Sequence, residues 1–150
     1  MTVALKDAKV IGGNFRNERN FAKARYSFAE DGGATGALVA FTCKTALIIH
    51  GVNFRVETAP LSGGSALCSF GISSDNDLFI DSIAKATLAI NTLQVPVVTY
   101  TLTEGTPNTL ATSYPLPKYV AADETLDFAI EAAALTAGVI WIEVEYSAPY

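Results

Sequence analysis

The 150-residue sequence contains one histidine, one tryptophan, one methionine and two cysteines. One histidine cannot form a histidine-rich metal site, and no nucleophile motif accompanies His50 that would indicate a Ser-His-Asp hydrolase. The apolar run LIIHGV around it is typical of a hydrogen-bonded structural histidine in a strand. The sequence therefore predicts a protein that is not an enzyme, with no catalytic, cofactor-binding or metal-binding residues and no cofactor.

The two cysteines, Cys43 and Cys68, lie in strand-like runs and belong to no CxxC pair or Cys/His cluster. We expect buried, reduced thiols that pack as small hydrophobic groups, with a disulfide or a reactive role as the alternative. The apolar runs are all shorter than the roughly 18 residues of a membrane helix. The first residues lack the pattern of a secretory leader. We expect a protein made in the cytoplasm, without a membrane partner.

Positive charge is scarce beyond residue 30. Residues 1–30 carry six basic and three acidic side chains, whereas residues 31–150 carry four basic and twelve acidic ones. The surface is either simply solvated, or the basic segment lies across the acidic body of a neighbouring copy or of another acidic protein. The basic residues have no aromatic stacking platform around them, so nucleic acid is not an expected partner.

Alternating apolar and polar residues recur along most of the chain. Ala22, Ala24, Tyr26 and Phe28 alternate with polar side chains, which is the pattern of a half-buried strand. Further strand-like runs cover residues 37–41, 46–59, 65–73, 86–92, 95–103, 125–133 and 139–147. Runs rich in glycine, proline, serine and aspartate separate them, including SSDND at residues 73–77. The pattern predicts a single all-β domain, an antiparallel β-sandwich with a jelly-roll-like arrangement. Only residues 81–90 favour a short helix.

The last strand-like run is the clearest. Its apolar side chains are expected to face the core, and its other side chains to face outward. The inward set is Ile140, Ile142, Val144 and Tyr146, and the outward set is Trp141, Glu143 and Glu145.

The first 20 residues differ from the rest. Gly12 and Gly13 interrupt them, and NFRNERN is too polar for a core strand. Fully extended, such a segment reaches about 60 to 70 Å. We expect an N-terminal arm at residues 1–20 that leaves a sandwich domain at residues 21–150 and reaches a neighbouring copy or a larger surface.

Two acidic clusters are candidate sites. Asp75, Asp77 and Asp81 could bind a cation, although the loop lacks the glycine and the closing glutamate of an EF-hand, and an Asx turn is the alternative. The acids at positions 123, 124 and 127 could form a carboxylate pair for glycoside hydrolysis, but no row of aromatic residues indicates a sugar cleft. A solvated acidic face is the simpler interpretation.

Three stretches carry a resemblance to a known family: ARYSFAEDGGATGALVAF, VETAPLSGGSALCSFGISSDNDLFIDSIA and YVAADETLDFAIEAAALTAGVIWIEVEYS. In order, they resemble small β-sandwich virion proteins from the structural gene clusters of tailed bacteriophages. In that group a strand ends in a GG turn, a TSGGSA hairpin leads into GxSSDxD, and LTAGxIxxxVEY closes the chain. The resemblance covers about residues 22–146.

The resemblance implies a non-enzymatic component of the virion. The first expectation is a capsid decoration or cement protein that stabilises the head shell. The alternative is a tail or fibre-base component with a receptor- or glycan-binding role. The expected partners are other copies of the chain, with a trimer favoured, and the major capsid protein or another virion protein.

A protein of this kind works through its interfaces, where tyrosine and arginine are frequent hot-spot residues. The alternative role for the tyrosines is to cover the ends of the sandwich. The interface candidates are Lys6, Lys9, Phe15, Arg16, Arg19, Phe21, Tyr114, Tyr119 and Tyr150.

Overall fold

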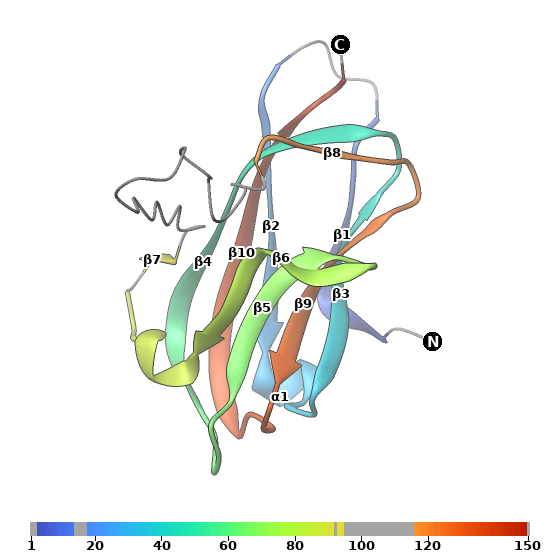
Figure 1. Ribbon diagram of the computed structural model, residues 1–150. Helices are drawn as coiled ribbons and strands as arrows, with labels where there is room; N and C mark the ends of the chain where they lie inside the picture. The colour runs from blue at the N-terminus through green and yellow to red at the C-terminus, as the bar shows by residue number, and fades with distance from the viewer. Residues whose placement is uncertain (1–2, 14–17, 92, 95–115, 150) are drawn as a thin grey trace, which may run out of the picture.

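The fold consists of two sheets packed face to face (Figure 1). The structure is a computed structural model, and it describes residues 3–13, 18–91, 93–94 and 116–149. Sheet A has the strand order β1 (Val3–Ile11), β3 (Gly36–Cys43), β9 (Thr125–Glu131), β5 (Leu67–Ile72) and β6 (Asp75–Ala84). Sheet B has the order β2 (Asn20–Ser27), β10 (Ala137–Ser147), β4 (Leu47–Leu61) and β7 (Leu93–Gln94), with β8 (Lys118–Val120) also paired to β4. The predicted antiparallel β-sandwich is confirmed, while the jelly-roll connectivity stays a prediction.

The core between the sheets is rich in aromatic side chains. Tyr26 and Phe54 of sheet B meet Phe128 of sheet A, with ring centroids 4.8 and 5.6 Å from that of Phe128. Phe70 lies 6.2 Å from Phe54 and 6.3 Å from Phe41 in edge-to-face contacts. All five rings are fully buried. Such offset and edge-to-face pairs add to the burial of apolar area and fix how the two sheets register.

The predicted faces of β10 are confirmed. Ile140, Ile142 and Val144 are buried, and Tyr146 packs half-buried against the same core. The alternate side chains of the strand, from Trp141 to Glu145, lie on the outer face of sheet B. The sequence period of two therefore identified which face of this strand packs inward.

The N-terminal segment corrects the sequence prediction. Residues 3–11 form β1, which pairs in parallel with β3, and Leu5 and Ile11 are each 3% exposed in the core. The backbone N–H of Lys44 donates to the carbonyl oxygen of Ile11 at 2.7 Å. The expectation that the first 20 residues leave their own sandwich is therefore wrong for residues 3–11.

A bulge in β1 explains why its sequence does not read as a strand. Ala4 pairs with Val39 and Lys9 pairs with Phe41, so residues 5–8 loop away from β3. The bulge interrupts the two-residue alternation, because Asp7 and Lys9 share the parity of the buried Leu5 and Ile11 and yet are not buried themselves.

Two other local predictions are wrong. The expected loop at residues 73–77 shrinks to a two-residue turn, because β6 already begins at Asp75. Gly71 makes this possible: a side chain there would place its Cβ 2.0 Å from the carbonyl oxygen of Asp75, so only glycine allows β6 to arch over β5.

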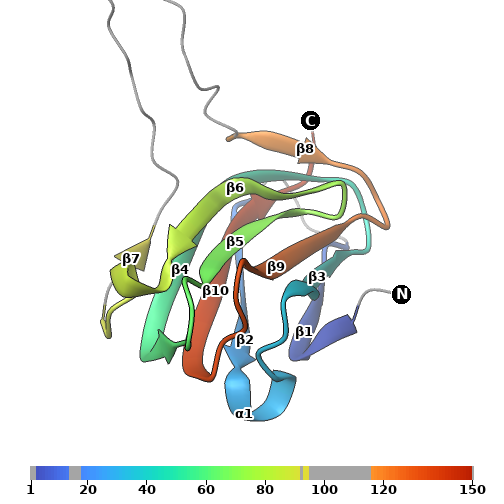
Figure 2. The same cartoon turned by 60° about the horizontal axis from the view of Figure 1, so that its bottom comes forward.

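Residues 86–91 of the expected strand instead lie in the 3-10 helix η1 (Lys85–Thr87) and the turn after it. A short helix is expected within residues 81–90, and η1 lies there, although residues 81–84 belong to β6. The other helix, α1 (Phe28–Asp31), lies at the end of β2 beside β1 and β3 (Figure 2). No helix in the described residues is long and apolar enough to cross a membrane.

The predicted state of the cysteines is confirmed, since Cys43 and Cys68 are both buried and free. Burial raises the pKa of each thiol to about 12, which keeps both protonated at neutral pH. The strand-like run at residues 95–103 lies outside the described residues.

Candidate interaction surface

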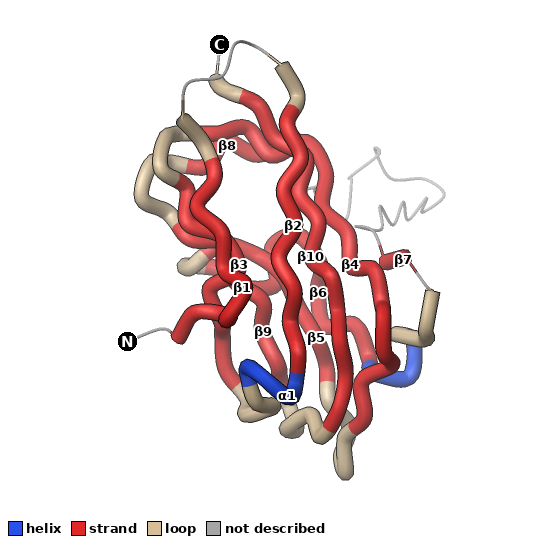
Figure 3. The backbone as a smooth tube through the Cα atoms, turned by 180° about the vertical axis from the view of Figure 1, so that it is seen from behind, coloured by secondary structure: helices blue, strands red, loops and turns tan. Residues whose placement is uncertain are grey.

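The outer face of sheet B is built around Trp141. This residue lies on β10, and its neighbours in register are Arg25 on β2 and Arg55 on β4. The strands β2, β10 and β4 lie side by side in sheet B (Figure 3). The charged ends of Lys23, Arg25 and Arg55 lie 5.1, 6.0 and 5.6 Å from the indole ring centroid. The indole N–H donates to a carboxylate oxygen of Glu57 at 2.6 Å. Cation–π contacts and this hydrogen bond fix the ring on the surface.

Ion pairs surround the tryptophan. Arg55 pairs with Glu143 at 3.1 Å, and Arg25 pairs with Glu30 at 3.3 Å and with Glu57 at 3.6 Å. The hydrogen bond from Trp141, together with the two arginines, holds the pKa of Glu57 below its ordinary value. Exposed pairs of this kind contribute little to stability, so the pattern is better explained as an ordered polar surface than as a source of fold stability.

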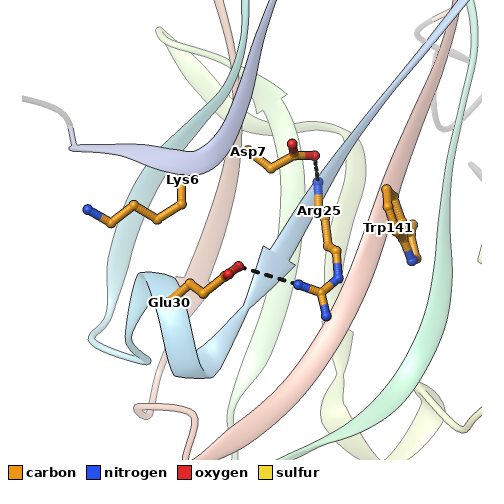
Figure 4. Close-up of a pocket in the computed structure, with 5 residues that line it drawn as sticks. All are labelled: Lys6, Asp7, Arg25, Glu30 and Trp141. Carbon is orange, nitrogen blue, oxygen red and sulfur yellow. Dashed lines mark hydrogen bonds and ion pairs between the residues drawn. The ribbon is translucent and has the colours of Figure 1, made fainter.

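Two shallow hollows flank β2. One, of about 260 Å³, is lined by Lys6, Asp7, Arg25, Glu30 and Trp141, with Arg25 placed between the two carboxylates and the indole (Figure 4). The other, of about 360 Å³, is lined by Phe21, Ala22, Lys23 and Glu143. Both are open to solvent and carry an aromatic ring beside charged groups. This composition suits a protein contact better than the enclosure of a small molecule.

The edge of β2 that faces away from β10 has two different halves. In the closed half, residues 25–27, the backbone N–H groups of Arg25 and Ser27 donate to Asp7 at 3.0 Å and to Asp31 at 2.8 Å. Asp31 also accepts from the backbone N–H of Lys6 at 2.6 Å, which ties β1 to α1. In the open half, residues 20–23, Phe21 is 77% exposed. The carboxylates thus close one half of the sandwich edge only.

The single histidine lies on the same sheet and has a structural contact. His50 lies in a register irregularity of β4 opposite β10, and its Nε2 is 2.7 Å from Oγ of Ser147. Ser147 is 5% exposed, and its hydroxyl also donates a hydrogen bond to the carbonyl oxygen of Ala148 at 3.2 Å. A buried hydroxyl bonded to its own backbone is poorly placed to attack a substrate. The predicted hydrogen-bonded histidine is confirmed.

The acidic clusters of the sequence do not converge. No group of three histidine, cysteine or acidic side chains among the described residues is arranged to hold a metal ion. A hydrogen bond with Asp75 raises the pKa of Asp77, while Asp81 is exposed further along β6. Asp127 is 2% exposed on β9, and burial raises its pKa. The prediction of a solvated acidic face is therefore wrong for Asp127. The sequence could not show this burial, because it depends on β6, which contacts β9 although β5 lies between them in the sheet.

The structure places the predicted interface residues on two sides of the molecule. Lys6 and Lys9 lie on β1, where Lys9 pairs with Asp7 of the same strand. Arg19 and Phe21 lie together at the start of β2, and Arg19 pairs with Glu145 at 2.7 Å. Tyr119, 60% exposed, lies on β8 beyond β4. The remaining candidates lie outside the described residues: Phe15, Arg16, Tyr114 and Tyr150.

The sequence missed the centre of this surface. Trp141 was correctly expected to face outward, yet its neighbours Lys23, Arg25 and Arg55 could not be grouped with it without the strand order. The signal available was the alternation itself, which placed an aromatic ring among outward-facing charges.

No protein-family model matches the sequence, and no curated protein matches it. Among solved structures, a chain in the "Acidic stable capsid structure of Helicobacter pylori bacteriophage KHP30" has a similar fold, with a TM-score of 0.55, 13% sequence identity and coverage of 88% of this chain and 89% of that chain. A chain in the "Cyanophage Pam1 capsid asymmetric unit" has a TM-score of 0.51, 16% identity and coverage of 93% and 91%. The predicted relationship to phage virion proteins is confirmed at the level of the fold.

Proposed function

We propose that this chain is a non-enzymatic structural protein of a phage virion that decorates the capsid shell and stabilises it through protein–protein contacts. The observation that carries the proposal is the extent of the fold likeness. The likeness spans about nine tenths of each chain, so it involves the whole fold and not one part of it. A fold alone does not determine a role, and the surface supplies the second argument.

The outer face of sheet B supports a role in contacts. It is a broad strand surface on which Arg25 and Arg55 form ion pairs and three cations lie within 6.0 Å of the centroid of the Trp141 ring. Within the described residues the hollows are shallow and no histidine, serine and carboxylate converge in them. A protein that stabilises a shell needs extended interfaces of this kind.

The proposed partners are the major capsid protein or another virion protein, and other copies of this chain, with a trimer favoured. The proposed contact residues within the described chain are Lys6, Lys9, Arg19, Phe21 and Tyr119. Their positions at the β1–β2 side and on β8 would allow one subunit to touch neighbours on two sides.

Imaging of virions that carry a tagged copy of the protein tests this proposal. We expect density for the tag over the head shell, in many symmetry-related positions. Purified protein should also co-sediment with assembled shells and not with unassembled capsid subunits. Tag density at the tail or fibre base, together with binding to host cells, would instead support the receptor- or glycan-binding alternative.

A further inference from the structure

The backbone of β2 offers unpaired hydrogen-bonding groups in its open half. Pairing with β10 is regular from Asn20 to Ser27, so alternate residues point their N–H and C=O groups to the same side. The N–H groups of Arg25 and Ser27 point away from β10, because Asp7 and Asp31 accept them there. The backbone groups of Phe21 and Lys23 therefore also point away from β10.

Nothing in the described part of the chain satisfies these groups. The hydrogen bonds there include no partner for the outward N–H and C=O groups of Phe21 and Lys23, and Lys23 forms no ion pair. Beside them lie the exposed ring of Phe21 and the 360 Å³ hollow. An open edge with an adjacent hollow is the arrangement that binds an extended strand from another chain.

The sequence contains a strand-like run that lies outside the described residues. Residues 95–103, VPVVTYTLT, alternate Val98, Tyr100 and Leu102 with threonines, and Glu104 follows. Residues 95–115 contain no lysine or arginine, so their charge complements the cations on and beside β2, namely Arg19, Lys23 and Arg25.

The described strands that flank this run favour a second copy as its source. Gln94 of β7 pairs with Phe54, and Lys118 of β8 pairs with Ile49, so both flanking strands lie on the side of β4 that faces away from β10 and together form one edge of sheet B. β2 is the opposite edge of the same sheet. At about 4.8 Å per strand, the two edges lie roughly 14 Å apart. A run anchored at one edge is well placed to meet the other edge of an adjacent molecule.

We propose that residues 95–103 of a second copy add to the open half of β2 as an extra strand of sheet B. The side chains of Phe21 and Lys23 then contact the apolar face of the run and Glu104. The contact joins two different surfaces, so each copy donates a strand to one neighbour and accepts a strand from another. This inference rests on the proposed function only in requiring that copies of the chain meet.

Cysteine cross-linking between separately made variants tests the pairing. Phe21→Cys protein is mixed in turn with Val98→Cys, Tyr100→Cys and Leu102→Cys protein of a different tag length, under mild oxidation. The native Cys43 and Cys68 are fully buried and serve as internal controls in the unmodified protein. We expect a disulfide-linked heterodimer with at least one of the three. Absence of a link in all three mixtures, or a link only within one chain when both changes are combined, would overturn the proposal.

A matched pair of variants tests the edge itself. Both Lys23→Pro and Lys23→Ala remove the lysine side chain, but only Lys23→Pro also removes the outward backbone N–H of the edge strand. In sedimentation velocity we expect Lys23→Pro to weaken self-association about tenfold relative to Lys23→Ala. Equal association of the two folded variants, or a monomeric unmodified protein, would contradict the strand addition. If Lys23→Pro does not fold, Phe21→Ser replaces it in the same comparison.

Failure of this inference is separable from failure of the proposed function. A protein that does not self-associate but still co-sediments with shells overturns the strand addition alone. A protein that self-associates through β2 but never binds shells overturns the decoration role alone.

Discussion

The two halves of the β2 edge of sheet B differ in whether their outward backbone groups have hydrogen-bond partners in the described residues. Residues 25–27 of β2 are closed by carboxylates from β1 and α1, whereas residues 20–23 keep a free edge and an exposed Phe21. Edge strands promote unwanted pairing unless side chains or other elements block them. The difference indicates that this fold blocks pairing where β1 reaches β2 and leaves it available further along the same strand.

The largest expected effect comes from the core beneath both halves. Ile142 of β10 is fully buried and pairs in register with Ala24 of β2 and Phe54 of β4. Ile142→Ala should lower the free energy of unfolding by about 2 to 5 kcal/mol, through lost burial and the cavity left behind. Chemical denaturation measures this, with the outward Glu143→Ala as control. A loss below about 1 kcal/mol would mean that the faces of β10 are reversed.

The second-largest effect is expected when a carboxylate that closes the β2 edge is removed. Asp31 accepts the backbone N–H groups of both Ser27 and Lys6, so Asp31→Ala leaves two donors unpaired. We expect a loss of about 2 kcal/mol in the free energy of unfolding, since bonds to charged acceptors contribute about 1.5 to 3 kcal/mol each when sheltered. The exposed Asp81→Ala on β6 is the matched control. Equal stability of the two variants would show that the carboxylate does not close the edge.

The sequence predicted the parts of the fold that obey a regular period. The alternation in β2 and β10 gave their inward faces, because each strand is buried on one side only. β1 was missed because its partner β3 lies far along the chain and its bulge hides Leu5 and Ile11. β6 was missed because its first residues, Asp75 to Asp77, are typical of a turn.

The candidate surface was predictable only in pieces. Phe21 and Arg19 were identified from residue type, but the capping roles of Asp7 and Asp31 depend on β1 and α1 meeting β2 in space. Strand order joins Trp141 to Arg25 and Arg55, and no pattern in the sequence gives that order.

A third effect contrasts the capping carboxylates with the carboxyl group of Asp127, one oxygen of which has no hydrogen-bond partner among the described residues. Oδ1 of Asp127 is buried without a hydrogen bond, and its pKa is raised, chiefly by burial. The folded state therefore holds this proton more tightly than the unfolded state does. The resulting stabilisation is present at pH values below the unfolded pKa and is lost as the pH rises through the folded pKa.

Unfolding curves across that pH range check the effect of Asp127. Asp127→Asn should weaken the dependence of the free energy of unfolding on pH, because the titrating carboxyl group is gone. Asp81→Asn, at an exposed position, should leave that dependence unchanged. Identical pH profiles for Asp127→Asn and the unmodified protein would contradict this account of the residue.

The smallest expected effect on stability is at the open half. Phe21 is exposed, so Phe21→Ser should change the free energy of unfolding by less than about 0.5 kcal/mol. The same change should weaken self-association, because the ring would no longer cover the incoming strand. A large loss of stability with unchanged association would reverse the assignment of the two halves.

Amide hydrogen exchange resolved at single residues tests the contrast between the halves most directly. In the free protein we expect slow exchange at Arg25 and Ser27, whose N–H groups are bonded, and fast exchange at Phe21 and Lys23. In the assembled protein all four should exchange slowly. Fast exchange that persists at Phe21 and Lys23 after assembly would contradict the claim that the open half of β2 is where the chains join.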